Sequence, residues 1–261
     1  MSALHLHTWG PADAPVVLVV HGVSNTGARY RRLALEGLPG HRVLAPDLRG
    51  HGGSTWDPPW GADTHVADLA DTLDAAGIGR ASVVGHSFGG LLGILLAAAA
   101  PDRVERLALL DPAAAMEPAR AARQAEAVRH DDGWADREEA STARRALRPP
   151  HAAGTVDEDL DTFLGEDPDG RVRLRFSRPA VITAWSEMAR PAPSLAGYPG
   201  EVLLVPALRD GYVSAALRAA LRRDLGERLR EHGIDAGHML FWDAHEELSA
   251  LLRGFLAETA A

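Results

Sequence analysis

The chain has 261 residues, of which 46% are hydrophobic, and it carries a formal net charge of −9 at neutral pH. This length and apolar content suffice to bury a sizeable core in one domain with an insertion. The negative charge argues against a nucleic-acid or anionic-membrane partner, because either would require a basic surface. The absence of cysteine excludes disulfides, thiolate catalysis and a thiol-bound zinc site.

No apolar stretch reaches the roughly 20 residues that a membrane span requires. The apolar run at residues 91–100 is too short and ends at Pro101. Residues 1–11 lack the basic and long apolar regions that are typical of a secretory signal. We therefore expect a soluble cytoplasmic protein with no membrane partner, and its state as a monomer or a homodimer stays open.

Short apolar runs alternate with helical patterns along most of the chain. Such runs are typical of parallel strands that helices cover on both faces. Strands are predicted at residues 16–20, 42–45, 81–84, 106–110, 201–205 and 228–234. Helices are predicted between and after them, at residues 29–36, 64–76, 91–99, 214–221 and 246–258. Ligands of such sheets gather at the carboxyl ends of the strands, so we expect the functional site there.

Residues 116–195 interrupt this alternation and are predicted to form an insertion. The remaining residues, 1–115 and 196–261, are predicted to form the core. Within the insertion the pattern predicts two helices, a polar and acidic loop, a short strand and a third helix. These elements are predicted at residues 117–130, 135–148, 149–170, 171–176 and 178–188, in that order.

The segment 83–90, Val-Val-Gly-His-Ser-Phe-Gly-Gly, is the most informative stretch of the chain. It predicts a strand that enters a tight turn at Ser87, followed by a helix. A serine raised from regular structure at a helix N-terminus can meet a base and unpaired backbone N–H groups. The strain of that turn requires small residues two positions before and after it, and Gly85 and Gly89 fill them. The pattern predicts a nucleophilic serine.

Four segments in this order resemble the α/β-hydrolase superfamily. They are His21-Gly22-Val23-Ser24, the loop from Asp47 to Ser54, the turn around Ser87, and the pair formed by residues 203–210 and 236–238. The resemblance implies a mostly parallel central sheet with helices on both faces and a mainly helical cap inserted after the sixth strand. It also implies an oxyanion hole made by the backbone N–H groups of Val23 and Phe88, and no cofactor.

The general base of a serine nucleophile must be a histidine, because its pKa lies near neutrality. In this superfamily the order along the chain is nucleophile, acid, base, which places the base after the last strand. His238 follows Gly237 on the loop that can reach Ser87, so we expect it to be the base, with His245 in reserve. His86 is expected to be structural or to line the pocket.

An acid must hold the imidazole in its productive tautomer. Asp210 follows the predicted strand at residues 201–205, which resembles the seventh strand of the superfamily, after which the acid lies. Ala207 stands where glycine is more usual in that segment. The expected triad is therefore Ser87, Asp210 and His238. Asp111 is the alternative. It follows the predicted strand at residues 106–110, and some members of the superfamily carry the acid after the corresponding strand, their sixth. Asp47 is expected to be a structural turn residue.

Further residues are expected to bind substrate, either beside the predicted oxyanion loop and nucleophile or in the insertion. They are His21, Ser24, His86, Trp134, Trp185 and Met239. Phe163, Phe176 and Met188 share the alternatives of lining the pocket or forming the small core of the cap.

Two pairs of residues could suggest metal ligands, namely His5 with His7 and Asp243 with His245. Neither pair has further ligands at a suitable spacing, so we expect surface histidines and no metal. The glycine-rich loop at residues 50–53 lacks the ending of a phosphate-binding loop.

The expected function is hydrolysis of a carboxylic ester, lactone or thioester of a small hydrophobic substrate through an acyl-enzyme. Carbon–carbon bond hydrolysis, perhydrolysis and acyl transfer use the same triad and stay open as alternatives. A non-catalytic ligand-binding protein on the same scaffold is a further alternative.

Overall fold

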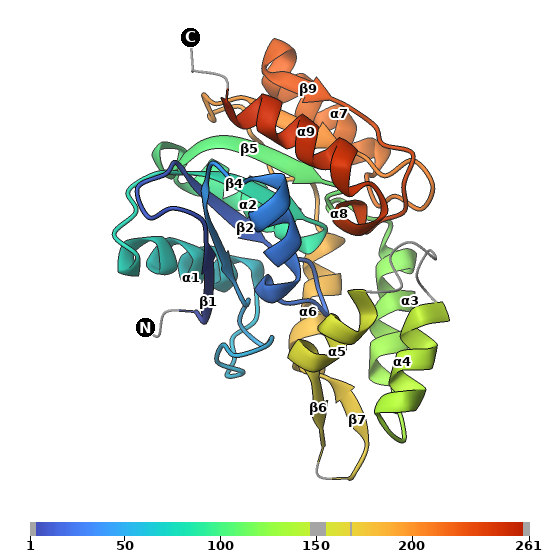
Figure 1. Ribbon diagram of the computed structural model, residues 1–261. Coiled ribbons are helices and arrows are strands. Elements are labelled where there is room, and N and C mark those ends of the chain that lie inside the picture. Colours follow the sequence, from blue (N-terminus) through green and yellow to red (C-terminus); the bar gives the residue numbers. More distant parts are fainter. Residues whose placement is uncertain (1–3, 147–154, 168, 258–261) are drawn as a thin grey trace.

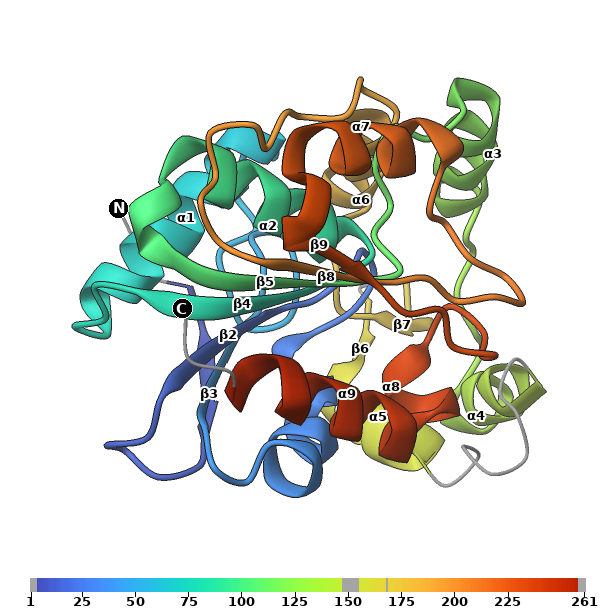
Figure 2. The same cartoon turned by 90° about the horizontal axis from the view of Figure 1, so that it is seen from above.

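A computed structural model describes residues 4–146, 155–167 and 169–257. Its centre is a seven-stranded sheet with the strand order β1-β3-β2-β4-β5-β8-β9 (Figures 1 and 2). All neighbouring strands are parallel except β1, which pairs antiparallel with β3 at one edge. The strands are β1 (Leu6–Trp9), β2 (Val16–Val20), β3 (Arg42–Pro46), β4 (Ala81–His86), β5 (Val104–Leu110), β8 (Val202–Val205) and β9 (Leu229–Glu231). The mostly parallel α/β sheet and its six predicted strands are confirmed, and β1 is an addition.

Helices cover both faces of the sheet (Figure 2). One face carries α1 (Ala62–Ala75), α2 (Phe88–Ala99) and α7 (Ala215–Leu225). The other carries η1 (Gly27–Tyr30), η2 (Leu33–Gly37), α8 (Leu240–Asp243) and α9 (His245–Ala257). The predicted helix at residues 29–36 is thus a 3-10 turn followed by a π-helical turn. Short 3-10 turns, η3 (Pro101–Arg103) and η5 (Gly226–Arg228), precede β5 and β9.

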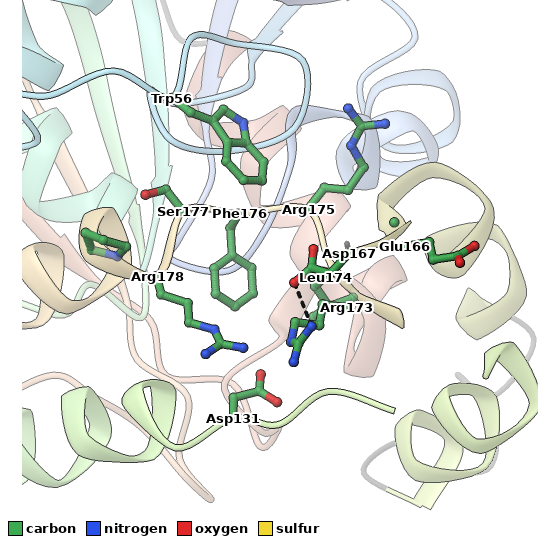
Figure 3. Close-up of a pocket in the computed structure, with 12 residues that line it drawn as sticks. Trp56, Asp131, Glu166, Asp167, Arg173, Leu174, Arg175, Phe176, Ser177 and Arg178 are labelled. Carbon is green, nitrogen blue, oxygen red and sulfur yellow. Dashed lines mark hydrogen bonds and ion pairs between the residues drawn. The ribbon is translucent and has the colours of Figure 1, made fainter. Parts of the chain in front are cut away.

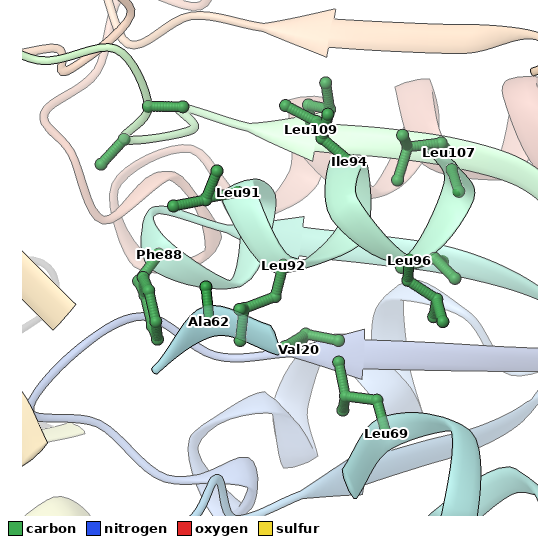
Figure 4. Close-up of a cluster of buried hydrophobic side chains, with 14 of the residues drawn as sticks. Val20, Ala62, Leu69, Phe88, Leu91, Leu92, Ile94, Leu96, Leu107 and Leu109 are labelled. Atoms are coloured by element: carbon green, nitrogen blue, oxygen red, sulfur yellow. The ribbon is translucent and has the colours of Figure 1, made fainter. Parts of the chain in front are cut away.

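Helix α2 packs its leucine-rich surface onto the middle of the sheet, as Figure 4 shows. Leu92 and Ile94 are fully buried, in one cluster with Val20, Leu107 and Leu109 of the strands. This close packing fixes the N-terminus of α2, and with it the turn that presents Ser87. No helix in the described ranges is both long and apolar enough to cross a bilayer.

The connection between β5 and β8 projects from one end of the molecule (Figure 1). It contains α3 (Pro118–Arg129), α4 (Arg137–Ala146), α5 (Thr155–Phe163), β6 (Leu164–Glu166), β7 (Val172–Leu174) and α6 (Arg178–Met188). The elements α3, α4, β7 and α6 agree with the predicted ones, and residues 147 and 148 of the second predicted helix lie outside the described residues. The division into core and cap at residues 116 and 195 stays a prediction.

The prediction of a loop at residues 149–170 is wrong at α5 and β6, and its residues 149–154 and 168 lie outside the described residues. Val156, Leu160 and Phe163 recur at helical spacing and are at most 1% exposed. Val156 and Leu160 pack against Ala140 of α4 in a small separate core. This apolar stripe stabilises a helix despite the acidic residues between its members.

Candidate active site

Ser87 lies at the turn between β4 and α2 with a φ of 56°, a conformation that L-residues rarely adopt. A Cβ on Gly85 would collide with the backbone of Gly89, and one on Gly89 would collide with the carbonyl of Val20. The turn is tied to the next strand, because Ser87 N donates to Leu110 O at 3.1 Å. The two glycines therefore allow the tight turn, as the sequence predicts.

His238 contacts the carboxylate of Asp111. Its Nδ1 donates to Asp111 Oδ2 at 2.6 Å, and Asp111 is fully buried directly after β5. The carboxylate also accepts from Tyr212 N at 2.9 Å and from Ala207 N at 3.2 Å. These donors compensate the burial of a negative charge and leave one defined orientation for the imidazole. With Nδ1 committed to the acid, Nε2 is the nitrogen left to exchange a proton with a nucleophile.

The expected contact between Asp210 and His238 is wrong. Asp210 is exposed, and no hydrogen bond joins it to His238 in the described part of the chain. The two loops do lie together, because Arg209 N donates to Ala236 O at 3.1 Å. The loop that carries Asp210 instead donates backbone hydrogen bonds to Asp111, which the sequence left open as the alternative acid.

His86, the residue before Ser87, supports the loop that carries His238. Its Nε2 donates to His238 O at 2.9 Å, and the two imidazole rings lie 4.5 Å apart between centroids. Burial, followed by the neighbouring charge of His238, holds the pKa of His86 well below its usual value. The ring is therefore neutral, with its proton on the Nε2 that donates to His238 O, and its buried Nδ1 has no hydrogen-bond partner among the described residues.

The loop after β2 lies directly against Ser87. A Cβ on Gly22 would come within 2.8 Å of Ser87 Cβ. Neither Val23 N nor Phe88 N takes part in the hydrogen bonds of the described residues, so both amides stay available as donors. Phe88 is the first residue of α2, where backbone N–H groups lack an intrahelical acceptor.

Two buried histidines hold this loop in place. His21 Nδ1 donates to Gly22 O at 2.7 Å, and its Nε2 accepts from Leu48 N at 2.8 Å. His51 Nε2 accepts from Ser24 N at 3.2 Å. Burial lowers the pKa of His21 to about 3 and that of His51 to about 4, so both stay neutral acceptors. His21 therefore positions the loop from behind, while Ser24 faces the cavity.

Ser87 and His238 line a cavity of about 340 Å³. Of the residues expected to bind substrate, Ser24, His86, Trp185 and Met239 line it, together with Val23 of the expected oxyanion hole. His21 and Trp134 do not. Eight further lining residues were not predicted as site residues, namely Gly22, Asn25, Arg29, Gln124, Val128, Arg144, Tyr212 and Trp242. Nothing in their local pattern distinguishes them from other residues of their helices and loops.

The other predicted residues of the insertion do not line this cavity. Trp134 packs against the small core of α4 and α5, and Met188 belongs to the main core. Phe163 is fully buried beside Arg29. Phe176 lines a second cavity of about 620 Å³ between the β6–β7 hairpin, the start of α6 and Trp56 (Figure 3). Neither Ser87 nor His238 is among the residues that line the second cavity.

His245 and Asp243, which the sequence left as a reserve base and a ligand pair, have separate structural contacts. His245 is buried with its Nε2 3.7 Å from Glu36 Oε2. Asp243 accepts from Gly237 N at 3.0 Å and so fixes the turn before His238.

His5, His7 and Asp47 form a group of three potential metal ligands in the described residues, with ligand atoms within 4.8 Å of one another. Asp47 already accepts hydrogen bonds from His7 Nε2 at 3.2 Å and from Gly27 N at 2.8 Å. Although burial raises it, hydrogen bonds from His7, Gly53 and Thr26 hold the pKa of Asp47 below its usual value. These contacts agree with the structural role expected of Asp47.

Residues 15–245 match the family model described as the alpha/beta hydrolase fold. The chain is 39% identical to the lipase LipV of Mycobacterium tuberculosis over 260 residues, which cover 97% of both chains. It is 29% identical to the esterase YbfF of Escherichia coli over 92% of this chain and 91% of the esterase. The crystal structure of E-2-(acetamidomethylene)succinate hydrolase superimposes with a TM-score of 0.84 at 22% identity, over 98% of this chain and 95% of that one.

Proposed function

The chain belongs to the α/β-hydrolase family, and from this premise we propose that it cleaves a carboxylic ester, lactone or thioester through an acyl-enzyme on Ser87. The observation that carries the proposal is the 2.6 Å contact of His238 Nδ1 with the buried carboxylate of Asp111, in a cavity that Ser87 also lines. The likeness to a lipase and to an esterase supports ester cleavage.

In the proposed reaction, the hydroxyl oxygen of Ser87 attacks the carbonyl carbon while its proton moves to His238 Nε2. The imidazolium is stabilised by Asp111, whose carboxylate stays ionised. Negative charge develops on the former carbonyl oxygen, which the N–H groups of Val23 and Phe88 stabilise. Each such donor contributes about 3–4 kcal/mol to the transition state.

The tetrahedral intermediate then collapses. The bond to the leaving oxygen or sulfur breaks, and that atom takes the proton from His238, which leaves an acyl ester on Ser87. Water attacks this ester, gives a proton to His238 and forms a second tetrahedral intermediate. Its collapse returns the proton to Ser87 and releases the carboxylic acid.

We propose that the connection between β5 and β8 acts as a cap over this site. Gln124 and Val128 of α3, Arg144 of α4 and Trp185 of α6 line the cavity beside groups from the core loops. The connection would then shape substrate choice while the core loops carry the chemistry.

A fluorophosphonate probe followed by intact-mass measurement tests the nucleophile. We expect one adduct on the wild type and on Ser24→Ala, and none on Ser87→Ala. A p-nitrophenyl ester series from acetate to decanoate then tests ester cleavage. An absence of labelling on Ser87 would refute the proposed hydrolase activity. Labelling without turnover of any ester would instead favour carbon–carbon hydrolysis or acyl transfer.

A further inference from the structure

The peptide unit between Gly211 and Tyr212 is hydrogen-bonded at both ends. Its N–H group belongs to Tyr212 and lies 3.1 Å from Asp111 Oδ1 and 2.9 Å from Asp111 Oδ2, to which it donates. Its carbonyl oxygen belongs to Gly211 and accepts from Arg120 Nη1 at 3.3 Å. The carbonyl and the N–H group of a trans peptide point in opposite directions. Arg120 and Asp111 therefore bind this unit from opposite sides.

Arg120 comes from the connection between β5 and β8. It lies in the first turn of α3, and Gln124 and Val128 follow it four residues apart, on the same face of the helix. Gln124 and Val128 line the cavity that contains Ser87, whereas Arg120 is not among its lining residues. The cavity-facing side of α3 therefore also contacts the loop that supports the acid.

Arg120 also covers the ring of Tyr212. Its guanidinium carbon lies 4.0 Å from the ring centroid, which is within the range of a cation–π contact. The same ring lies 4.4 Å from the imidazole of His238, measured between centroids. Arg120 and Tyr212 are both partly buried, so water competes less for these contacts than it would at the surface. Tyr212 thus connects Arg120 to the base through its side chain and to the acid through its backbone.

Arg120 binds a carbonyl that the other anchor of the loop does not reach. The loop after β8 is tied to the segment after β5 where Ser214 Oγ donates to Ala114 O at 3.0 Å. Gly211 lies before that anchor, and among the described residues Arg120 is the one donor to its carbonyl oxygen. A carbonyl that accepts from a guanidinium group polarises its amide, so the N–H group at the other end becomes a stronger donor. Arg120 therefore orients this peptide unit and strengthens its bond to Asp111.

We propose that Arg120 is a positioning residue, through which the connection between β5 and β8 fixes the pair of Asp111 and His238. It acts on the acid through one peptide unit and on the base through the ring of Tyr212. This inference rests on the proposed function and deepens it. The proposed cap then sets kcat by its contact with the loop after β8, in addition to shaping substrate choice by its cavity-lining residues.

The test replaces Arg120 by methionine, which keeps an unbranched apolar side chain and removes the guanidinium group. We expect Arg120→Met to reduce kcat at least about tenfold, because the acid loses its oriented donor. KM should change less than about twofold, because Arg120 is not among the residues that line the cavity. The factor in kcat should be the same for p-nitrophenyl acetate and p-nitrophenyl octanoate.

Two further variants control this measurement. Arg123→Met makes the same change on the same helix, at a residue that is exposed and outside the cavity lining. It should leave kcat as in the wild type. Arg120→Lys should recover most of the kcat that Arg120→Met loses, because an ammonium group can still donate to Gly211 O and contact the ring of Tyr212.

Two readouts separate positioning from a general loss of stability. Both are taken well below the unfolding midpoint of each variant. The proton on His238 Nδ1 should give an NMR signal that moves upfield in Arg120→Met and stays in place in Arg123→Met. Labelling of Ser87 by the fluorophosphonate should slow together with kcat in Arg120→Met, because that reaction also requires the base.

A loss in KM alone, or one that depends on the length of the acyl chain, would overturn the inference and assign Arg120 to substrate binding. An unshifted signal with normal kcat would overturn it as well. If Arg120→Met does not fold, the neutral and shorter Arg120→Gln takes its place. Its kcat should fall at least about threefold, and wild-type kcat would overturn the inference. Failure of Ser87 to label in the wild type would instead refute the proposed function, whatever the Arg120 variants show.

Discussion

The loops after β5 and β8 each carry an aspartate, and the two carboxylates differ in burial and in hydrogen bonding. Asp111 is fully buried and accepts hydrogen bonds from His238 and from the backbone of Ala207 and Tyr212. Asp210 is exposed, although its loop runs beside the one that carries His238. Proximity along the sheet edge is therefore not sufficient for a contact with His238. The backbone donors that fix the carboxylate distinguish Asp111 from Asp210.

The largest expected effect separates these two residues. Asp111→Asn should reduce kcat by about 10⁴-fold, because the amide favours the wrong tautomer of His238 and cannot stabilise the imidazolium. Asp210→Asn should retain kcat within about twofold, since an exposed side chain without a contact to His238 contributes little. The measurement is turnover of the best p-nitrophenyl ester, with folding checked by circular dichroism. A large loss of kcat in Asp210→Asn, with nearly normal kcat in Asp111→Asn, would show that Asp210 and not Asp111 is the acid.

A smaller effect tests the backbone donors. A Cβ on Gly211 would collide with the carbonyl of Ala207 and come within 3.0 Å of Asp111 Oδ1. Gly211→Ala should therefore displace the neighbouring N–H of Tyr212 and reduce kcat by about 10- to 100-fold, because small misplacements of catalytic groups are costly.

Gly197→Ala serves as the matched control for Gly211→Ala, since a Cβ there meets no atom within 4 Å. It should leave kcat unchanged. Equal activity of the two variants would show that the loop after β8 does not position the acid.

The smallest expected effect is on the pH dependence of stability, and it compares a buried histidine with an exposed one. His51 is buried with a pKa lowered by burial to about 4, against about 6.5 when the chain is unfolded. Between these values the unfolded chain binds the additional proton, so stability is fully present above about pH 6.5 and falls toward pH 4. This loss amounts to about 1.4 kcal/mol per pH unit for one histidine.

Chemical unfolding at pH 7, 6, 5 and 4 measures this slope. His51→Gln should flatten the decline by about one proton, because glutamine can still accept from Ser24 N without titrating. His232→Gln should leave the slope as in the wild type, because His232 is exposed. An identical slope in all three proteins would refute the assignment of a proton to His51.

The sequence predicted what depends on backbone geometry. Gly85 and Gly89 mark the turn at Ser87, because no larger residue fits there, and the apolar runs mark the buried parallel strands. The sequence pattern favoured Asp210 over Asp111, whereas the carboxylate that contacts His238 is that of Asp111. Asp111 precedes a proline and so resembles an ordinary turn residue, and its donors come from residues about 100 positions away.

The insertion was predicted less well than the core. Helix α5 was missed because its acidic residues outweighed the apolar stripe of Val156, Leu160 and Phe163. Arg29 and Arg144 were missed because a cavity wall assembled from separate elements leaves no local pattern in the chain. Placement of such residues depends on tertiary packing.

The contact between His238 and Asp111 can be tested most directly by proton NMR of the wild type, Asp111→Asn and Asp210→Asn. We expect a strongly deshielded, slowly exchanging signal from the proton on His238 Nδ1 in the wild type, because that proton is hydrogen-bonded to a buried carboxylate at 2.6 Å. The signal should persist in Asp210→Asn and disappear or move upfield in Asp111→Asn. A signal that survives in Asp111→Asn and is lost in Asp210→Asn would show that His238 is paired with Asp210 and not with Asp111.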